Sequence, residues 1–440
     1  MLALDLADKF LRRVSYVHGS YDDPKSYEHL ASVLNDIEHS SSEGEEVGPA
    51  NTRCFLANNR IFYFALPPFI FIKVASFIRR YCWTKTGFNR AIIEKPFGRD
   101  LESAQTMIRE LSDILKENEM YRIDHYLGKE MVVNLMYIRF ANMALSSMWH
   151  SNNIASVVIT FKEPFGTLGR GGYFDKFGII RDVIQNHLLQ VLTIVAMERP
   201  VSLESEDIRD EKVKVLKSIP PVLLENTVIG QYGTSLDGKE VAYLDDPGVP
   251  KDSTCPTFAS MVLFVQNERW DGVPFILKGA KAVNERKAEV RIQFKSVPGQ
   301  IFRDLHQNEL VVRIQPDEAI YLKIQTKKPG FGMSPQETFL DLSYKERFPN
   351  QRAPEAYEKL LLDVLRGESG FFVRSDELEA AWRIFTPILH ELEEKKVQPI
   401  PYVYGSRGPV ESDALASRFG FTRSAESIYP HSYTSEVDSP

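Results

Sequence analysis

The sequence predicts two domains of different fold class: an incomplete parallel-sheet domain of the α/β class, followed by a larger α+β domain with a mainly antiparallel sheet and helices. Two patterns predict this. In residues 60–116 short apolar runs alternate with helical patterns, as in a parallel sheet. In residues 257–342 strand patterns follow one another with few helical patterns between them, which favours antiparallel pairing. A chain of 440 residues is also long enough for two hydrophobic cores.

The first part of the chain contains two strand patterns that end in proline-bearing loops. Strands are predicted at residues 60–66 and 89–94, and helices at 27–38, 70–81 and 101–116. Asp100 can cap the last of these helices, and the polar stretch 40–51 is typical of an exposed loop. The strands end at Pro67-Pro68 and at Lys95-Pro96. The carboxyl ends of parallel strands are where such sheets bind ligands.

The second part begins with helical and strand patterns and continues as a sheet. Helices are predicted at residues 131–145 and 175–197, with a strand at 154–162 between them. Further strands are predicted at 258–265, 288–294, 309–314 and 319–324, and closing helices at 356–365 and 377–393. We therefore divide the chain into domains at 1–122 and 123–421. The Ser/Thr/Glu-rich residues 422–440 are predicted to be a disordered tail.

Composition argues against several classes of protein. The formal net charge of −7 and the pI near 5.8 disfavour a broad nucleic-acid-binding face. Cys54, Cys82 and Cys255 lie far apart and match neither a disulfide framework nor a zinc site, which favours a reducing compartment. The longest apolar run, residues 61–72, is interrupted by prolines and is too short to cross a bilayer. We expect a cytoplasmic protein without nucleic-acid or membrane partners.

The densest group of chemically active side chains lies at residues 122–130, Arg-Ile-Asp-His-Tyr-Leu-Gly-Lys-Glu. Asp124 can hold a neighbouring imidazole in one tautomer, and Lys129 can meet a phosphate or carboxylate as a point charge. A solvated polar turn is the plainer alternative. The mixture of carboxylate, imidazole, phenol and ammonium favours a site for an anionic, hydroxyl-rich ligand.

His187 lies in the long predicted helix and has two interpretations. A single histidine in an apolar helix is most often a core residue. Asp182 and Asn186 accompany it, however, so the helix also carries a polar patch. An imidazole oriented by a carboxylate can act as a general base near neutral pH, and Asp124 is a candidate partner.

Two further patterns are less specific. The glycines of residues 166–172 are, taken alone, most simply interpreted as a flexible loop. Basic residues recur through the strands from 278 to 323, where neighbours on one face could surround phosphates, although scattered surface lysines are the alternative. In the first hundred residues no Gly-x-Gly-x-x-Gly follows a strand, so a dinucleotide fingerprint is missing there.

Together, residues 94–100, 122–130, 161–172, 178–189, 285–290 and 404–409 resemble the glucose-6-phosphate dehydrogenase family, and the agreement runs in order from about residue 16 to 421. The resemblance implies that C1 of glucose 6-phosphate is oxidised to 6-phosphogluconolactone with reduction of NADP+, the first step of the pentose phosphate pathway. The first domain is then the remnant of a Rossmann-type coenzyme domain. No metal is implied, because the coenzyme accepts the hydride.

The resemblance also implies roles for single residues. His187 would be the catalytic base and Asp124 its orienting partner. The substrate would be held by Lys95, His125, Tyr126, Lys129, Glu163, Asp182, Lys281, Arg286 and Gln315. The coenzyme would lie against Pro67, Phe71 and Lys95. A second, structural NADP+ site is implied at Lys278, Lys287, Arg291, Arg313, Tyr321, Lys323, Asp341 and Arg407, weakened by the lack of a tryptophan after residue 421.

The sequence departs from the family pattern at the N-terminus. Family members begin with a strand, a glycine-rich turn and a helix that cradles the pyrophosphate, and this sequence starts after that unit. We therefore expect little dehydrogenase activity from the 440-residue chain alone. The alternative function is a truncated, weakly active or inactive sugar-phosphate-binding homologue that pairs with full-length subunits. A homodimer or homotetramer built through the large sheet is the expected partner state.

Overall fold

The computed structural model describes residues 2–42, 58–302 and 305–421 of the chain. The predicted loop at 40–51 lies largely outside these residues, and the predicted tail 422–440 and Cys54 lie wholly outside them. Cys82 and Cys255 are both free thiols. None of the described helices is both long and apolar enough to cross a membrane.

The described chain divides into two compact units. The first comprises residues 1–124 together with 360–379, and the second comprises 125–359 and 380–440. The segment 360–379 therefore belongs to the first unit, although the sequence-based division placed it in the second domain. Its membership has a physical cause. Leu360, Val364 and Phe372 are buried in one cluster with Ile92 and Tyr121 of the first unit.

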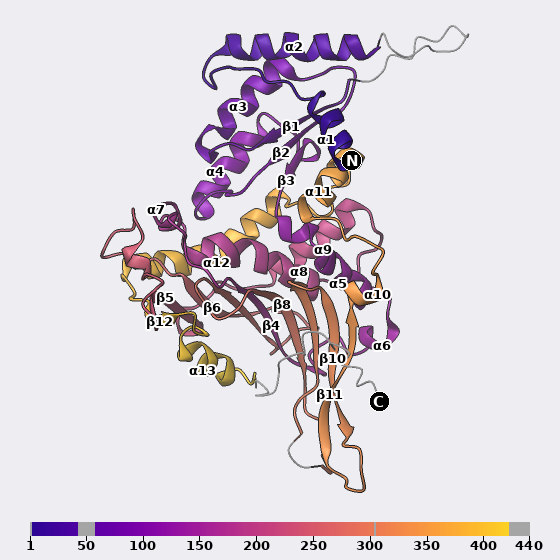
Figure 1. The fold of residues 1–440 in the computed structure, drawn as a ribbon, viewed down its shortest axis with the longest axis vertical. Helices are drawn as coiled ribbons and strands as arrows, with labels where there is room; N and C mark the ends of the chain where they lie inside the picture. The colour runs from indigo at the N-terminus through magenta and orange to yellow at the C-terminus, as the bar shows by residue number, and fades with distance from the viewer. Residues whose placement is uncertain (1, 43–57, 303–304, 422–440) are drawn as a thin grey trace, which may run out of the picture. The chain divides into compact units, whose positions relative to one another are not determined.

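The first unit is built on a parallel sheet of three strands in the order β1-β2-β3 (Figure 1). The strands are β1 (Arg60–Phe64), β2 (Asn89–Ile93) and β3 (Met120–Arg122). Parallel β1 and β2 were predicted from their apolar runs, and their register pairs Phe64 with Ile93. The carboxyl ends of these two strands therefore lie side by side at one edge of the sheet.

Helices of the first unit follow the predicted order. They are α1 (Leu2–Leu11), α2 (Pro24–Ser42), α3 (Phe71–Phe77) and α4 (Leu101–Ser112), and α3 continues as the π-helical segment η2 (Ile78–Cys82). The predicted cap is present, because the Asp100 carboxylate accepts the backbone N–H of Ser103 at 2.9 Å. Phe71 is fully buried and packs against Phe64, so its ring forms part of the core below the sheet edge.

The second unit is built on a nine-stranded sheet in the order β11-β10-β9-β8-β4-β7-β6-β5-β12. Its strands are β4 (Ile154–Lys162), β5 (Thr227–Ser235), β6 (Phe258–Phe264), β7 (Pro274–Ala280), β8 (Lys287–Phe294), β9 (Glu309–Gln315), β10 (Ala319–Lys327), β11 (Pro335–Ser343) and β12 (Ile400–Tyr404). All neighbours pair antiparallel except β4 with β7 and β5 with β12. The predicted mainly antiparallel sheet is confirmed.

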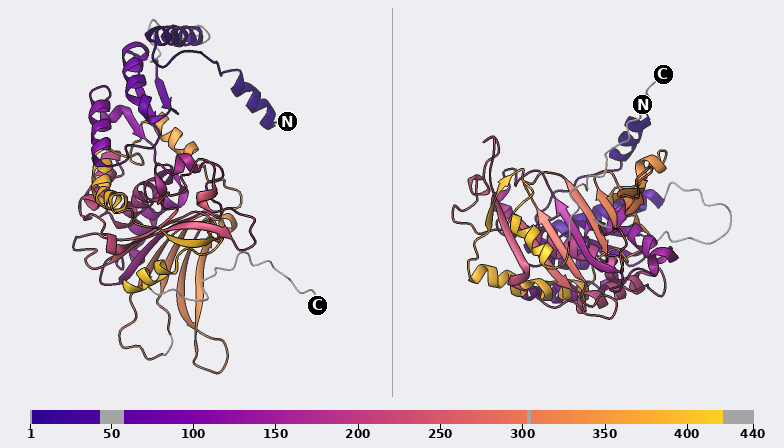
Figure 2. Two further views of the ribbon diagram at one scale, coloured as in Figure 1. Left: turned by 90° about the vertical axis from the view of Figure 1, so that its left-hand side faces the viewer. Right: turned by 90° about the horizontal axis from the view of Figure 1, so that it is seen from below.

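Helices cover both faces of this sheet (Figures 1 and 2). On one face lie α5 (Glu130–Phe140), η5 (Ile180–Leu188), α8 (Leu189–Ala196) and α9 (Ser205–Lys217), and on the other lies α13 (Val410–Arg418). The short helices are α6 (Met143–Ser146), α7 (Gly171–Phe174) and α10 (Tyr344–Arg347). Two longer helices, α11 (Ala356–Arg366) and α12 (Ser375–Glu394), each contribute residues to both units.

The long helix predicted at 175–197 is the main local difference. The chain makes a left-handed bend at Gly178, whose φ is +69°, and this bend separates α7 from η5. The first helical stretch, η5, is π-helical, and regular α-helix follows as α8. Short π-helical insertions are frequent at functional sites. This one carries both Asp182 and His187.

Candidate functional site

The aromatic and imidazole rings of the densest motif meet His187 on η5. The His187 ring centroid lies 4.5 Å from that of His125 and 4.7 Å from that of Tyr126. His187 is only 3% exposed, so these rings hold it in place. The structure therefore brings together three of the residues predicted as a site, from segments about sixty residues apart in the chain.

The rings of Tyr126 and His125 are each contacted from a further element. The Gln315 side chain, at the end of β9, donates from Nε2 to the Tyr126 hydroxyl at 3.3 Å. Tyr357 of α11 stacks on His125, with ring centroids 5.8 Å apart and planes 13° apart. Gln315 was among the predicted residues. Tyr357 was not, because nothing in the sequence around it indicates that it reaches residue 125.

A second group of predicted residues is joined by one ammonium. Lys281, just after β7, lies 2.6 Å from the Glu163 carboxylate and 3.9 Å from the Asp182 carboxylate. In a π-helix the backbone hydrogen bonds join residues five apart, so Asp182 lies close to the face that carries His187. Glu163 and Asp182 are only partly buried, which leaves carboxylate oxygens able to accept hydrogen bonds from a polyhydroxylated ligand.

Two predicted cations remain unpaired in the described part of the chain. Neither the Lys129 ammonium nor the Arg286 guanidinium makes an ion pair or hydrogen bond with the described residues. Lys129 precedes the first turn of α5 and is half-buried next to the ring cluster. A half-buried ammonium without a carboxylate partner suits a phosphate.

The site residues predicted in the first unit follow the strands of its parallel sheet. Pro67 and Lys95 follow the adjacent strands β1 and β2, Pro67 exposed and Lys95 half-buried. Asp124 follows β3 and is 3% exposed. These positions are at the carboxyl ends of parallel strands, the edge at which a dinucleotide binds in sheets of this type.

The basic residues predicted for a second nucleotide lie on the other side of the large sheet. Lys278, Lys287 and Arg291 line a small cavity of about 60 Å³ together with Lys162. The buried hydroxyls of Ser260 and Ser412 line the same cavity and have no hydrogen-bond partner among the described residues. Such hydroxyls are donors available to a bound ligand.

Sequence reasoning missed the acidic partners of these basic residues. Lys162 and Lys287 both lie 2.9 Å from the Glu285 carboxylate. Burial alone would raise the pKa of Glu285, but the two ammonium groups outweigh it and lower the pKa to about 2. Arg291 is likewise 2.9 Å from Glu309. The alternating signs along the strands could have indicated this pairing.

The remaining predicted basic-cluster residues are also close to one another. Lys278 and Arg407 both reach the Asp413 carboxylate of α13, at 3.7 and 3.0 Å. On β9 to β11, the Arg313 guanidinium lies 5.7 Å from the Tyr321 ring centroid, and Tyr321 pairs with Asp341 across the strands. Lys323 is buried 3.4 Å from Glu309.

Comparison with known proteins identifies relatives along nearly the whole chain. Residues 3–134 match the family model "Glucose-6-phosphate dehydrogenase, NAD binding domain", and residues 136–424 match its C-terminal domain. The chain is 53% identical to glucose-6-phosphate 1-dehydrogenase 2 of Mus musculus over 94% of its own length and 79% of that protein's. It is 51% identical to the Dictyostelium discoideum enzyme, covering 96% of this chain and 83% of that one.

Solved structures agree with these matches. A glucose-6-phosphate dehydrogenase in complex with its substrate superposes with a TM-score of 0.88 at 50% identity, covering 95% of this chain and 84% of that one. The enzyme from Mycobacterium avium superposes with a TM-score of 0.77 at 33% identity, covering 93% of this chain and 82% of that one. The likeness extends over both units.

Proposed function

The chain belongs to the glucose-6-phosphate dehydrogenase family, and from this premise we propose how its own residues carry out the family's reaction. The protein is an oxidoreductase that oxidises glucose 6-phosphate with reduction of NADP+ in the pentose phosphate pathway. The observation that carries the assignment of the site is the packing of His187 against His125 and Tyr126.

His187 is the general base in this proposal. Its buried imidazole takes the proton of the C1 hydroxyl as the C1 hydride leaves, and an imidazole has an ordinary pKa close to neutrality. NADP+, when bound, supplies the hydride acceptor. The residues at the coenzyme edge fit this use, since Pro67 and Lys95 follow the adjacent parallel strands β1 and β2.

The other predicted residues orient the sugar. Lys129, His125 and Tyr126 hold the phosphate by charge and hydrogen bonds. Glu163 and Asp182 accept hydrogen bonds from sugar hydroxyls, and their shared contact with Lys281 keeps both carboxylates in position. Lys281, Arg286 and Gln315 are the remaining residues proposed to bind the substrate. The roles of Asp124 and Lys95 remain predictions of the family resemblance.

The reaction is tested by following nicotinamide absorbance with purified chain, NADP+ and glucose 6-phosphate. Glucose 1-phosphate is the matched substrate control, because its C1 oxygen is esterified and has no proton to lose. Any NADPH should form only with glucose 6-phosphate, and its rate tests the sequence-based expectation of little dehydrogenase activity. A folded chain that binds glucose 6-phosphate but forms no NADPH would instead favour the sugar-phosphate-binding homologue raised as the alternative.

We also propose that the basic cluster around Lys278, Lys287 and Arg291 binds a second NADP+. The Ser260 and Ser412 hydroxyls, which have no partner among the described residues, support this. Carboxylates in the cavity lining partly neutralise its basic residues, which argues for a modest affinity for NADP+. The test is the melting temperature with saturating NADP+. A ligand that binds only the folded chain raises it, and Lys287→Ala should remove most of the increase if this cluster is the site.

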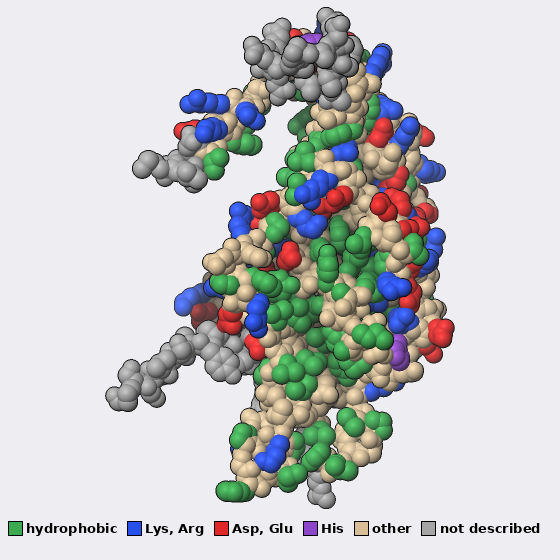
Figure 3. All heavy atoms as spheres, turned by 90° about the vertical axis from the view of Figure 1, so that its right-hand side faces the viewer, with side chains coloured by type: hydrophobic (Ala, Val, Ile, Leu, Met, Phe, Trp, Pro, Cys, Tyr) green, Lys and Arg blue, Asp and Glu red, His purple; other side chains and the backbone are tan. Residues whose placement is uncertain are grey.

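A homodimer or homotetramer is proposed as the assembled state. Hydrophobic side chains gather on the face that includes the β10–β11 hairpin (Figure 3), where Phe331, Met333 and Leu340 are exposed. Exposed apolar patches of this kind are typical of subunit interfaces. Sedimentation velocity distinguishes these states, and a monomer at micromolar concentration would contradict the proposal.

A further inference from the structure

The glycine-rich segment 166–172 begins three residues after Glu163 and is held by one buried carboxylate together with the Tyr232 and Tyr404 hydroxyls. Asp246, in the connection between β5 and β6, is 7% exposed. Its carboxylate accepts hydrogen bonds from the Thr167 hydroxyl, from the Gly169 N–H at 3.1 Å and from the Gly171 N–H at 3.3 Å. Three donors of one segment therefore converge on one side chain.

The segment is pressed against that connection and is not a free loop. A Cβ on Gly171 would lie 2.4 Å from Val249 and 2.7 Å from the Asp246 carboxyl carbon. Leu168, with φ of +51°, adopts a left-handed conformation that non-glycine residues rarely take unless surrounding contacts impose it. Gly171 and Gly172 therefore permit close packing, which the interpretation of these glycines as a flexible loop did not include, whereas Gly169 has no neighbour within 4 Å.

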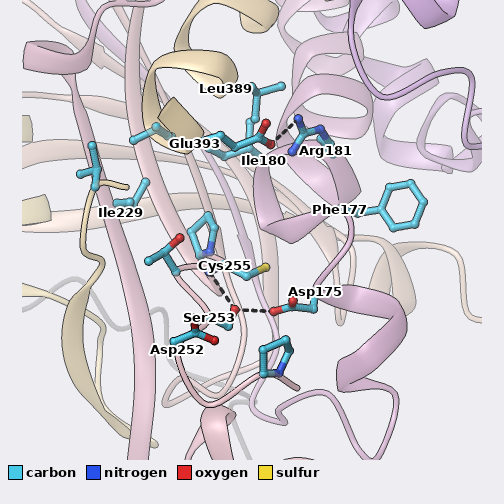
Figure 4. Close-up of a pocket in the computed structure, with 15 residues that line it drawn as sticks. Asp175, Phe177, Ile180, Arg181, Ile229, Asp252, Ser253, Cys255, Leu389 and Glu393 are labelled. Carbon is cyan, nitrogen blue, oxygen red and sulfur yellow. Dashed lines mark hydrogen bonds and ion pairs between the residues drawn. The ribbon is translucent and has the colours of Figure 1, made fainter. Parts of the chain in front are cut away.

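The connection between β5 and β6 also holds Asp175, which lies three residues after the glycine-rich segment. Asp175 accepts a hydrogen bond from the Ser253 hydroxyl at 2.5 Å (Figure 4) and another from the Tyr243 hydroxyl at 2.8 Å. Asp175 lines a cavity of about 330 Å³ with Ile180 and Arg181 of η5, the stretch that also carries Asp182. The β5–β6 connection thus fixes the chain between Glu163 and η5 at both ends.

We infer that Asp246 is a positioning residue for glucose 6-phosphate binding, acting through Glu163. This inference rests on the proposed role of Glu163. The Glu163 N–H donates to the Ala280 carbonyl at 2.9 Å, and the Glu163 carbonyl accepts the Val283 N–H at 3.1 Å. Beyond Phe165, whose carbonyl accepts the Ala282 N–H at 2.9 Å, the chain enters the segment that Asp246 helps to hold. Without the carboxylate, the Gly169 and Gly171 N–H groups lose their acceptor, and the Thr167 hydroxyl keeps only its contact with the Tyr232 hydroxyl.

The test is calorimetric titration of glucose 6-phosphate into the full chain, without coenzyme, for wild type, Asp246→Asn, Glu163→Gln and the double variant. Asparagine keeps the shape, but its NH₂ group faces an N–H donor. We expect Asp246→Asn to raise Kd roughly tenfold, the effect of about one lost hydrogen bond. In the Glu163→Gln background the same change should have little further effect, because the two residues act as a unit.

The matched control is Asp245→Asn, which removes the same charge one residue away. Asp245 is exposed and pairs only at the surface with Lys251. It should leave Kd unchanged. If Asp246→Asn does not fold, Thr167→Val replaces it in the titration. This variant removes one of the three donors to Asp246 and should raise Kd by a smaller factor.

The outcomes separate the two proposals. Weakened binding in Glu163→Gln with unchanged binding in Asp246→Asn and Thr167→Val would overturn the positioning role while leaving the site intact. Additive effects in the double variant would mean that Asp246 acts generally on the fold and would also overturn it. Unchanged binding in Glu163→Gln would remove the proposed role of Glu163 itself.

Discussion

Replacing His187 with asparagine is expected to lower kcat for glucose 6-phosphate oxidation about a thousandfold, the usual contribution of a general base. An asparagine amide can still hydrogen-bond to a hydroxyl but cannot accept its proton near neutral pH. Because His187 acts on C1 and other residues hold the phosphate, KM for glucose 6-phosphate should change little. Steady-state kinetics with saturating NADP+ measures both constants.

The matched control for that variant is His390→Asn, which changes an exposed histidine of α12. It should have wild-type kinetics. The melting temperature of the His187→Asn chain checks that it is folded, because asparagine loses the ring contacts with His125 and Tyr126. More than a tenth of wild-type kcat in the folded variant would exclude His187 as the base.

Replacing Lys129 with alanine is expected to raise KM for glucose 6-phosphate about a hundredfold, with a smaller change in kcat. A charge-assisted contact to a phosphate in a partly desolvated site contributes about 2–3 kcal/mol, and tenfold in affinity corresponds to about 1.4 kcal/mol. Lys129 makes no ion pair with the described residues, so its removal leaves none of their carboxylates unpaired. Stability should therefore be nearly unchanged.

The Lys129 variant has a control in Lys217→Ala, an exposed lysine at the end of α9. That change removes the same charge from the same unit and should leave KM unaltered. Lys129→Arg should recover part of the affinity, because it restores the positive charge but not the compact geometry of an ammonium. An unchanged KM in Lys129→Ala would place the phosphate elsewhere.

The sequence predicted an element correctly where the residues of that element alone show a clear pattern. The apolar, β-branched run at 154–162 matches the bounds of β4, and Asp100 is the helix cap that its position predicted. It was a poorer guide to β7, which pairs with both β4 and β6 and was not among the predicted strands. The prolines and glycines around that strand weaken its apolar pattern.

The site was predicted as a list of residues, and its arrangement depends on tertiary structure. The apolar periodicity predicted one helix over residues 175–197. It could not indicate the left-handed bend at Gly178 or the π-helical segment that follows. Nor could it indicate that Asp246, about eighty residues from Gly169 in the chain, holds the glycine-rich segment. Contacts of this sequence separation leave no local pattern.

The most direct test of the proposed sugar-phosphate site is calorimetric titration of glucose 6-phosphate and of glucose into the wild-type chain and into Lys129→Ala, without coenzyme. Binding does not require hydride transfer, so the result depends only on the residues that hold the sugar and its phosphate. The site described above predicts that wild type prefers glucose 6-phosphate to glucose by about a hundredfold or more, and that Lys129→Ala loses most of this preference. Equal affinity of wild type for the two ligands would contradict it.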